Sequence, residues 1–190
     1  ATVFETGSNR WTRHEQWPPA EARESSWFLH ANGSLSTAPP RREVVAFSEH
    51  VSDPSQPVPY TEDIHLNRTR EYMTDDQRFA ARRPDVLVFE TPVVEKELHL
   101  AGPIVADLWV STTGTDADFV VKLIDVFPDT LSGVENGVPM GGYQMLVRGE
   151  IMRGRYRNSF ERPEAFVPGQ PTKVRFTLPD VAHCFQKGHR

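Results

Sequence analysis

The sequence has few of the residues that mark disulfide-rich, membrane-spanning or nucleic-acid-binding proteins. Its 190 residues include one cysteine, Cys184, so no disulfide forms within the chain, and a buried, inert thiol is the expected role. The longest apolar stretch, residues 104–110, is interrupted by Asp107 and is far shorter than the roughly 20 residues of a membrane-spanning helix. No segment is rich in Lys and Arg, and the net charge is -5. Neither a membrane nor nucleic acid is an expected partner.

The common catalytic and nucleotide-binding motifs are also missing. No G-x-S-x-G nucleophile elbow, phosphate loop or G-x-G-x-x-G run occurs. The 7 histidines contain no i,i+4 pair, and there are no paired cysteines, so the usual spacing of a zinc site is absent. We therefore expect no cofactor and no catalytic residue, although a Ser-His-Asp site assembled from distant residues remains a formal alternative.

The residues that are present predict an all-β domain with a hydrophobic core. The 11 Phe and 4 Trp supply bulky core side chains, and short strand-like segments recur between turn residues. In the clearest segment, Ile104, Ala106 and Val110 alternate with Asp107 and share the predicted core face. The strand-like segments are 27–30, 44–47, 86–89, 104–111, 119–126, 145–147 and 174–178. This spacing is typical of a single β-sandwich spanning residues 1–190.

Three connecting segments have a specific prediction. Asn32-Gly33 is expected to form a hairpin turn. Residues 74–83 favour one short helix, capped by Thr74 or Asp75 and ended by Pro84. The Pro-rich, polar segment 53–67 is expected to be a long connection packed on the sandwich.

Two kinds of polar motif leave alternatives open. Asp116 and Asp118 are candidate calcium ligands, because paired hard oxygens suit that ion, but a capping or ion-pairing role is the favoured interpretation. The N-x-[ST] triplets at Asn32 and Asn67 are glycosylation sites only in a secreted eukaryotic protein.

Trp11 and Trp17 also have two interpretations. Together with Pro18 and Pro19 they form a candidate sugar-stacking platform, which would make the chain a carbohydrate-binding module. The favoured role is to hold the N-terminal arm against the sandwich or against a neighbouring domain.

Several runs of residues, in order along almost the whole chain, resemble the C-terminal domain of the X-prolyl dipeptidyl-peptidase and cocaine-esterase (CocE/NonD) family of hydrolases. These runs are GSNRW at 7–11, WPP at 17–19, RPDVLVF at 83–89, LAGPI at 100–104, TDADF at 115–119, LIDVFP at 123–128, RGRYR at 153–157 and FQKGHR at 185–190. Within that family, YMTDDQRF at 72–79 and MGGYQMLVRGE at 140–150 resemble the α-amino acid ester hydrolases, also described as cephalosporin or glutaryl-7-aminocephalosporanic acid acylases.

The resemblance implies a galactose-binding-like jelly roll that accompanies an upstream α/β-hydrolase domain of the same polypeptide. The serine, aspartate and histidine of such a hydrolase have no counterpart in this sequence, so the chain is expected to be inactive alone, and it would stabilise the catalytic core and border its active site. The resemblance also implies association into homo-oligomers. An independent carbohydrate-binding module is the alternative function.

Aromatic and arginine side chains in irregular segments are the candidate contacts to the hydrolase domain, because such residues are enriched in interfaces. They are Trp11, Trp17, Tyr72, Arg78, Arg82, Arg83 and Tyr143. At the other end, relatives of this family continue past Arg190 into a further apolar strand, so the sandwich is expected to be truncated there, with an exposed or partner-covered edge near Arg190.

Overall fold

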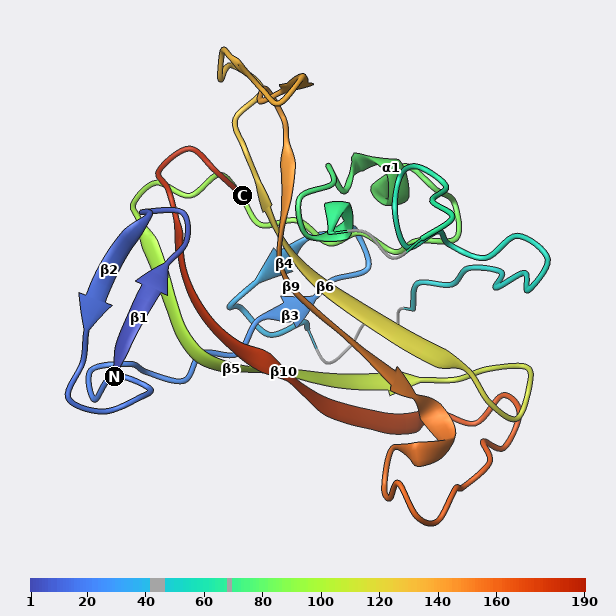
Figure 1. Ribbon diagram of the computed structural model, residues 1–190. Coiled ribbons are helices and arrows are strands. Elements are labelled where there is room, and N and C mark those ends of the chain that lie inside the picture. The colour runs from blue at the N-terminus through green and yellow to red at the C-terminus, as the bar shows by residue number, and fades with distance from the viewer. Residues whose placement is uncertain (42–46, 68–69) are drawn as a thin grey trace.

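The computed structural model describes residues 1–41, 47–67 and 70–190. Two long antiparallel strand pairs form its frame (Figure 1). β5 (Leu98–Val110) pairs with β10 (Thr172–Phe185), and β6 (Asp118–Val126) pairs with β9 (Gln144–Arg153). The all-β sandwich predicted from the sequence is confirmed.

The core lies between the two pairs and follows the alternation expected of strands. Ala106 of β5 is buried, and Ile104 and Val110 of the same strand pack against the core while Asp107 does not. The buried cluster is Ala106, Phe166, Val174, Phe176 and Leu178, and the second pair contributes Phe119, Val121 and Met152. Burying each large apolar side chain stabilises the fold by about 1.5–3 kcal/mol, so this cluster holds the pairs together.

Shorter elements surround this frame. They are the pairs β1 (Thr2–Glu5) with β2 (Arg10–Arg13), β3 (Phe28–Leu29) with β4 (Leu35–Ser36), and β7 (Val134–Glu135) with β8 (Val138–Pro139), and the helical turns η1 (Glu71–Met73), α1 (Arg78–Ala81) and η2 (Gly154–Tyr156). The chain after β1 joins the edge of β10 through a parallel bridge between Thr6 and His183. None of the described helical turns has the length or apolar character needed to cross a membrane.

Most of the strand-like segments predicted from the sequence are strands, with one exception. Segments 27–30, 104–111, 119–126, 145–147 and 174–178 overlap β3, β5, β6, β9 and β10, and the Asn32-Gly33 turn joins β3 to β4 with Gly33 at φ 78°. The prediction for 86–89 is wrong, because ladder pairing begins only at Glu90, which bridges Ser34, and Leu87 and Val88 stay exposed. Of segment 44–47, residues 44–46 lie outside the described residues.

The helix is shorter than residues 74–83 and begins at a different cap. Gln77 is the residue before α1. Its backbone N–H donates to Gln144 O on β9 (3.0 Å) and not to a carbonyl of a preceding helical turn, so the helix does not extend toward residue 74. The side chain that pairs with a free N–H group of the first turn is Asp76, not Thr74 or Asp75, because Asp76 Oδ1 accepts a hydrogen bond from the N–H of Arg78 (3.1 Å). Tertiary pairing with β9 therefore sets the start of the helix.

The connection over 53–67 contains neither helix nor strand, as predicted, but its expected packing on the sandwich is wrong. Ile64 and Leu66 are both 101% exposed. This segment instead projects from the domain beside α1 (Figure 1).

The last residues of the chain lie against the end of β6. Val126 and Arg190 exchange two backbone hydrogen bonds, each 3.1 Å, which is the pattern of an antiparallel pair. Within the described residues β6 has one strand partner, β9, so its opposite edge has no partner strand beyond this pair.

Candidate functional site

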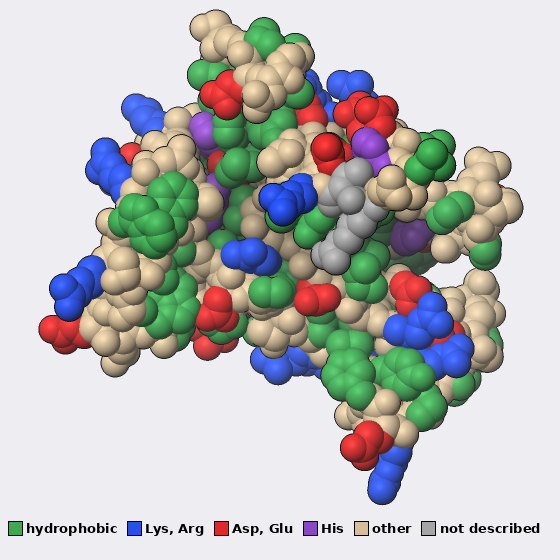
Figure 2. Space-filling view, in the orientation of Figure 1, with side chains coloured by type: hydrophobic (Ala, Val, Ile, Leu, Met, Phe, Trp, Pro, Cys, Tyr) green, Lys and Arg blue, Asp and Glu red, His purple; other side chains and the backbone are tan. Residues whose placement is uncertain are grey.

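The exposed apolar side chains of the described residues gather in a few places. Trp11 of β2 is 72% exposed and meets Phe4 of β1 edge to face, with ring centroids 5.4 Å apart. Figure 2 shows hydrophobic side chains gathered over this hairpin, at the left of the view. Trp11 is therefore accessible, as the interface hypothesis requires.

Trp17 has a different environment from Trp11. Its indole Nε1 donates to Asp180 Oδ2 (2.7 Å) near the irregular part of β10, and its ring lies 5.8 Å from that of His14. The side chain is half-buried. Trp17 thus tethers the N-terminal arm to the sandwich, and the two tryptophans have different aromatic neighbours, Phe4 for Trp11 and His14 for Trp17.

A further group of exposed apolar side chains lies on the segment 47–67, which we call the apolar arm. Its exposed members are Phe47, Val51, Val58, Tyr60, Ile64 and Leu66. Loops longer than about 12–15 residues without secondary structure are uncommon in compact domains and are usually functional or linkers. The arm is therefore both unusually long for a loop and rich in exposed apolar side chains, as expected of a segment that contacts a partner.

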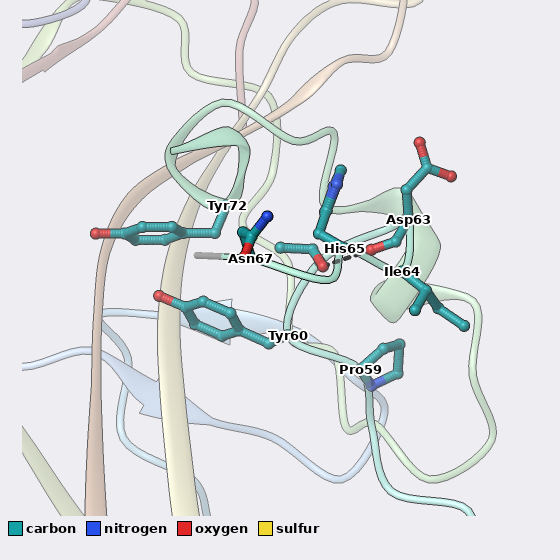
Figure 3. Close-up of a pocket in the computed structure, with 8 residues that line it drawn as sticks. Pro59, Tyr60, Asp63, Ile64, His65, Asn67 and Tyr72 are labelled. Atoms are coloured by element: carbon teal, nitrogen blue, oxygen red, sulfur yellow. Dashed lines mark hydrogen bonds between the residues drawn. The ribbon is translucent and has the colours of Figure 1, made fainter. Parts of the chain in front are cut away.

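A shallow hollow of about 420 Å³ lies where the apolar arm meets η1 (Figure 3). The rings of Tyr60 and Tyr72 stack there with centroids 4.9 Å apart, and Thr61 donates to the Asp63 carbonyl (2.7 Å) across the loop. Pro59 and Ile64 complete an apolar side of the hollow. Tyr72, one of the predicted interface residues, is thus half-buried beside the arm.

Arg78 and Tyr143, two further predicted interface residues, are turned into the domain. Arg78 forms an ion pair with Asp76 and donates to Gly141 O (3.2 Å). Tyr143 is buried, and its hydroxyl donates to Thr74 O (2.6 Å). Burial raises the pKa of this phenol. Tyr143 therefore fixes the segment before α1 to the start of β9.

Arg82 and Arg83 end α1 in different surroundings. Arg83 makes a bidentate pair with Asp85 (2.8 and 2.7 Å) and also donates to Gln56 O (3.0 Å) at the base of the apolar arm. Arg82 is the C-cap residue and is exposed. Of this pair, Arg82 is the side chain with access to a partner.

The candidate calcium ligands are occupied by arginines. Arg153 donates two hydrogen bonds of 2.8 Å to Asp118, and Arg155 donates to Asp116 through its backbone N–H (3.0 Å) and Nε (2.5 Å). The hydrogen bonds from Arg153, together with the charges of Arg153 and Arg155, lower the pKa of Asp118. The geometry favours the ion-pair interpretation over the calcium interpretation.

A buried polar network joins two strands, β6 and β10, to the segment after β1 and to the C-terminal segment. Asp125 Oδ2 accepts from His183 Nε2 (3.2 Å), and Asp125 Oδ1 accepts from His189 Nδ1 (2.8 Å). Thr6 Oγ1 lies 2.8 Å from His183 Nδ1. An alcohol, an imidazole and a carboxylate thus lie in a row, but Asp125 and His183 are both 0% exposed. A substrate has no access to them, so this row is structural.

A second polar cluster lies at the end of β1, β5 and β10. His99 Nδ1 is 2.8 Å from Glu5 Oε1, and His99 Nε2 is 3.7 Å from Cys184 Sγ. Cys184 is buried, as predicted, and desolvation raises the pKa of its thiol to about 11. The spacing of histidines and cysteines in the sequence did not predict this cluster, because its members are far apart in the chain.

Comparison with known proteins agrees with this architecture. Residues 2–190 match the family model of the X-Pro dipeptidyl-peptidase C-terminal non-catalytic domain. The chain belongs to this family of non-catalytic domains, which confirms the resemblance found in the sequence.

The individual proteins that the chain resembles are hydrolytic enzymes. An aminopeptidase structure from a marine sediment Thaumarchaeota archaeon is 40% identical over 99% of this chain and 31% of that chain, with a TM-score of 0.88. An α-amino acid ester hydrolase structure is 39% identical over 99% of this chain and 32% of that chain, with a TM-score of 0.87. The cocaine esterase of Rhodococcus sp. (strain MB1 Bresler) is 27% identical over 99% of this chain and 32% of its own length. The chain thus spans about a third of the length of these hydrolases.

Proposed function

We propose that this chain is the C-terminal accessory domain of a serine hydrolase, that it packs on the α/β-hydrolase domain of the same polypeptide, and that it stabilises that domain and borders its active site. The similar proteins are an aminopeptidase, an α-amino acid ester hydrolase and a cocaine esterase, which all cleave acyl bonds. The parent is therefore proposed to hydrolyse an ester or amide, and this chain is proposed to be inactive alone.

The observation that carries the docking proposal is the surface area. The chain exposes 13946 Å². A compact monomer of 21.5 kDa exposes about 9200 Å². The excess of roughly 4700 Å² is more than a folded monomer of this mass needs to leave in water. A domain that docks on a larger body accounts for it.

The apolar arm is the proposed centre of this docking surface. Ile64 and Leu66 are 101% exposed, and Phe47 is 77% exposed. Transfer of a Leu or Ile side chain from water into an interface contributes about 1.5–3 kcal/mol. The hollow lined by Tyr60, Tyr72 and Ile64 offers a place for an apolar side chain of the partner domain. Exposed Arg82, at the end of α1, lies beside this surface.

Co-purification with the hydrolase domain tests the proposal. The two domains are expressed as separate polypeptides, and their complex is measured by size-exclusion chromatography and calorimetry. The double variant Ile64→Asp with Leu66→Asp is expected to lose association, because two charges would have to be desolvated. Val167→Asp is the matched control, since Val167 is 60% exposed but lies outside the arm. Equal association of both variants would reject the arm as the docking surface.

The open edge of β6 is a second proposed contact. Val126 directs its N–H and C=O toward Arg190, away from β9, and strand alternation places the backbone groups of Lys122 and Ile124 on the same open side. We propose that a further segment of the parent polypeptide pairs with this edge. Hydrogen exchange tests this: the amides of Lys122 and Ile124 should be protected in the complete polypeptide and exchange rapidly in the 190-residue chain. Equal exchange rates in the two proteins would rule it out.

The alternative function is carbohydrate binding. The observation in its favour is the 72% exposure of Trp11 beside Phe4. A glycan array with the Trp11→Ala variant as control separates the two functions. Glycan binding that depends on Trp11 would replace the docking role with a binding-module role for that hairpin.

A further inference from the structure

Three strands place a carboxylate, an imidazole and a thiol beside one another at one end of the sandwich. Glu5, His99 and Cys184 each offer one ligand atom, and these atoms all lie within 4.8 Å of one another. His99 and Cys184 are direct partners in the register of β5 and β10, and Glu5 reaches them because the chain after β1 bridges β10 at Thr6. The sheet itself, not a flexible loop, holds these groups together.

The two nitrogens of His99 face different groups. Nδ1 lies 2.8 Å from the Glu5 carboxylate, which accepts its hydrogen bond. Nε2 lies 3.7 Å from Cys184 Sγ and 3.8 Å from the Glu97 carboxylate. The imidazole therefore presents one nitrogen to a thiol and a carboxylate, while the other nitrogen is fixed by a carboxylate behind the ring.

These separations suit a tetrahedral zinc-type site. With a metal–sulfur bond of about 2.3 Å and a metal–nitrogen bond of about 2.0–2.1 Å, the edge between sulfur and nitrogen is about 3.6 Å. The observed 3.7 Å between Cys184 Sγ and His99 Nε2 matches this edge. The edge between nitrogen and oxygen is about 3.4 Å. Glu97 Oε2 lies 3.8 Å from His99 Nε2, close to this edge, and the Glu97 side chain is 58% exposed.

The surroundings of the ligands resemble the support that metal-binding histidines receive. A histidine that binds a metal through one nitrogen usually donates the other N–H to a carboxylate, which orients the ring and strengthens the ligand. Glu5 occupies this position behind His99, and it accepts a hydrogen bond of 2.5 Å from Ser8 Oγ that holds it in place. Gln186 Nε2 lies 3.5 Å from Cys184 Sγ.

We propose that His99 Nε2 and Cys184 Sγ bind a borderline-soft divalent cation of the zinc class, that the Glu97 carboxylate turns toward the cation as a third ligand with water as the fourth, and that Glu5 is the positioning residue for His99. Binding forms a metal–sulfur bond and releases the thiol proton to solvent, with no redox change. Thiolate, imidazole and carboxylate together suit zinc better than calcium or magnesium, which prefer oxygen ligands only. Such a site would cross-link β5 and β10.

Access distinguishes a metal site from a catalytic cysteine. The thiol of Cys184 is 0% exposed, so the carbonyl of a substrate has no path to Sγ. A cation is small and approaches from the side of His99, whose side chain is 53% exposed. The cluster is therefore proposed to bind an ion and not to perform nucleophilic catalysis.

Cobalt and zinc titrations of the protein test the site. Co²⁺ is expected to produce a thiolate-to-cobalt charge-transfer band in the near ultraviolet, and Cys184→Ser should abolish it. Calorimetry with Zn²⁺ should show binding weakened about 10- to 100-fold in Glu5→Gln, which keeps the fold but removes the charged partner of His99. His99→Gln should lose more affinity than Glu5→Gln, because it removes a direct ligand.

Controls keep the result interpretable. His14→Gln is the matched control, since His14 follows β2 and its Nε2 lies 3.1 Å from Thr12 Oγ1 instead of beside a thiol. It should leave the cobalt band and the zinc affinity unchanged. Because Cys184 is buried and its variant has a risk of unfolding, the partly exposed His99 position decides the question. No cobalt band in the wild type, or equal zinc affinity in wild type and His99→Gln, would overturn the proposal.

Discussion

The Asp125 carboxylate lies 3.2 Å from Nε2 of His183, and both side chains are completely removed from solvent. Asp125 comes from β6 and His183 from β10, so this contact links the two strand pairs of the sandwich. His189 Nδ1 reaches the other carboxylate oxygen at 2.8 Å and ties the C-terminal segment to the same point. A single carboxylate thus satisfies two imidazoles that approach from different parts of the chain.

Replacement of this carboxylate should be among the most destabilising changes in the domain. In Asp125→Ala the buried nitrogens of His183 and His189 lose their acceptor, and loss of one partner of a buried polar pair costs about 3–5 kcal/mol. Urea denaturation measures the loss. Asp107→Ala is the control, because Asp107 pairs with Lys173 at the surface and should contribute about 1 kcal/mol or less. Similar losses in the two variants would show that the Asp125 network does not hold the strand pairs together.

Gly7 is the glycine at which a side chain should be least tolerated. It has φ 82°, and a Cβ there would lie 2.0 Å from Cys184 O, at the point where the N-terminal segment joins β10. Gly137 has the similar φ of 84° with nothing within 4 Å, so Gly137→Ala isolates the backbone strain, about 1–2 kcal/mol. Gly7→Ala should cost about 2 kcal/mol more, through the clash with backbone. Thermal unfolding compares the two variants, and equal shifts would mean that the N-terminal segment moves away at little cost.

The sequence allowed the frame of the fold to be predicted, because local alternation reports which strand faces are buried. Residues 104–110 alternate between more and less buried positions, and residues 119–121 do the same, with Phe119 and Val121 in contact with the core. Segment 86–89 has equally apolar residues, but within the described part of the chain none of these residues is paired in a ladder. Local pattern does not reveal whether a partner strand is present, which is why that prediction failed.

The polar clusters could not be predicted because their members meet only through the tertiary fold. His99 lies 94 residues from Glu5 and 85 residues from Cys184. Asp125 and His183 are 58 residues apart. The i,i+4 spacing rule for histidines tests one helix face and says nothing about neighbouring strands. The aromatic residues pose the opposite problem: Trp11 and Tyr143 were equal interface candidates, yet only Trp11 is exposed.

The Cys184 thiol should be unreactive in the folded, metal-free protein. Its pKa is raised to about 11, so the thiolate that reacts with disulfide reagents is scarce at neutral pH, and the sulfur is buried as well. Ellman's reagent should label the protein only after urea unfolds it. The folded state binds the thiol proton more tightly than the unfolded state, whose cysteine pKa is about 8.5. The protonated thiol therefore contributes its full stabilisation of the folded state below a pH of about 8.5, and this contribution is lost as the pH rises toward 11. Rapid labelling of the native protein would contradict the burial of this side chain.

The Asp116 and Asp118 loop should respond to loss of its arginines and not to calcium. Arg153 and Arg155 already occupy the carboxylate oxygens that calcium would need, so addition of Ca²⁺ or of a calcium chelator should leave the melting temperature unchanged. Arg153→Gln should lower stability by less than about 1 kcal/mol, because Asp118 is 46% exposed and solvent screens the pair. The lowered pKa of Asp118 makes its contribution complete above pH of about 4, and it is lost as the pH falls through the folded-state value. Arg155→Gln should cost more, because the Asp116 side chain is only 16% exposed. A rise in melting temperature with Ca²⁺ would reverse this assignment and make the loop a calcium site.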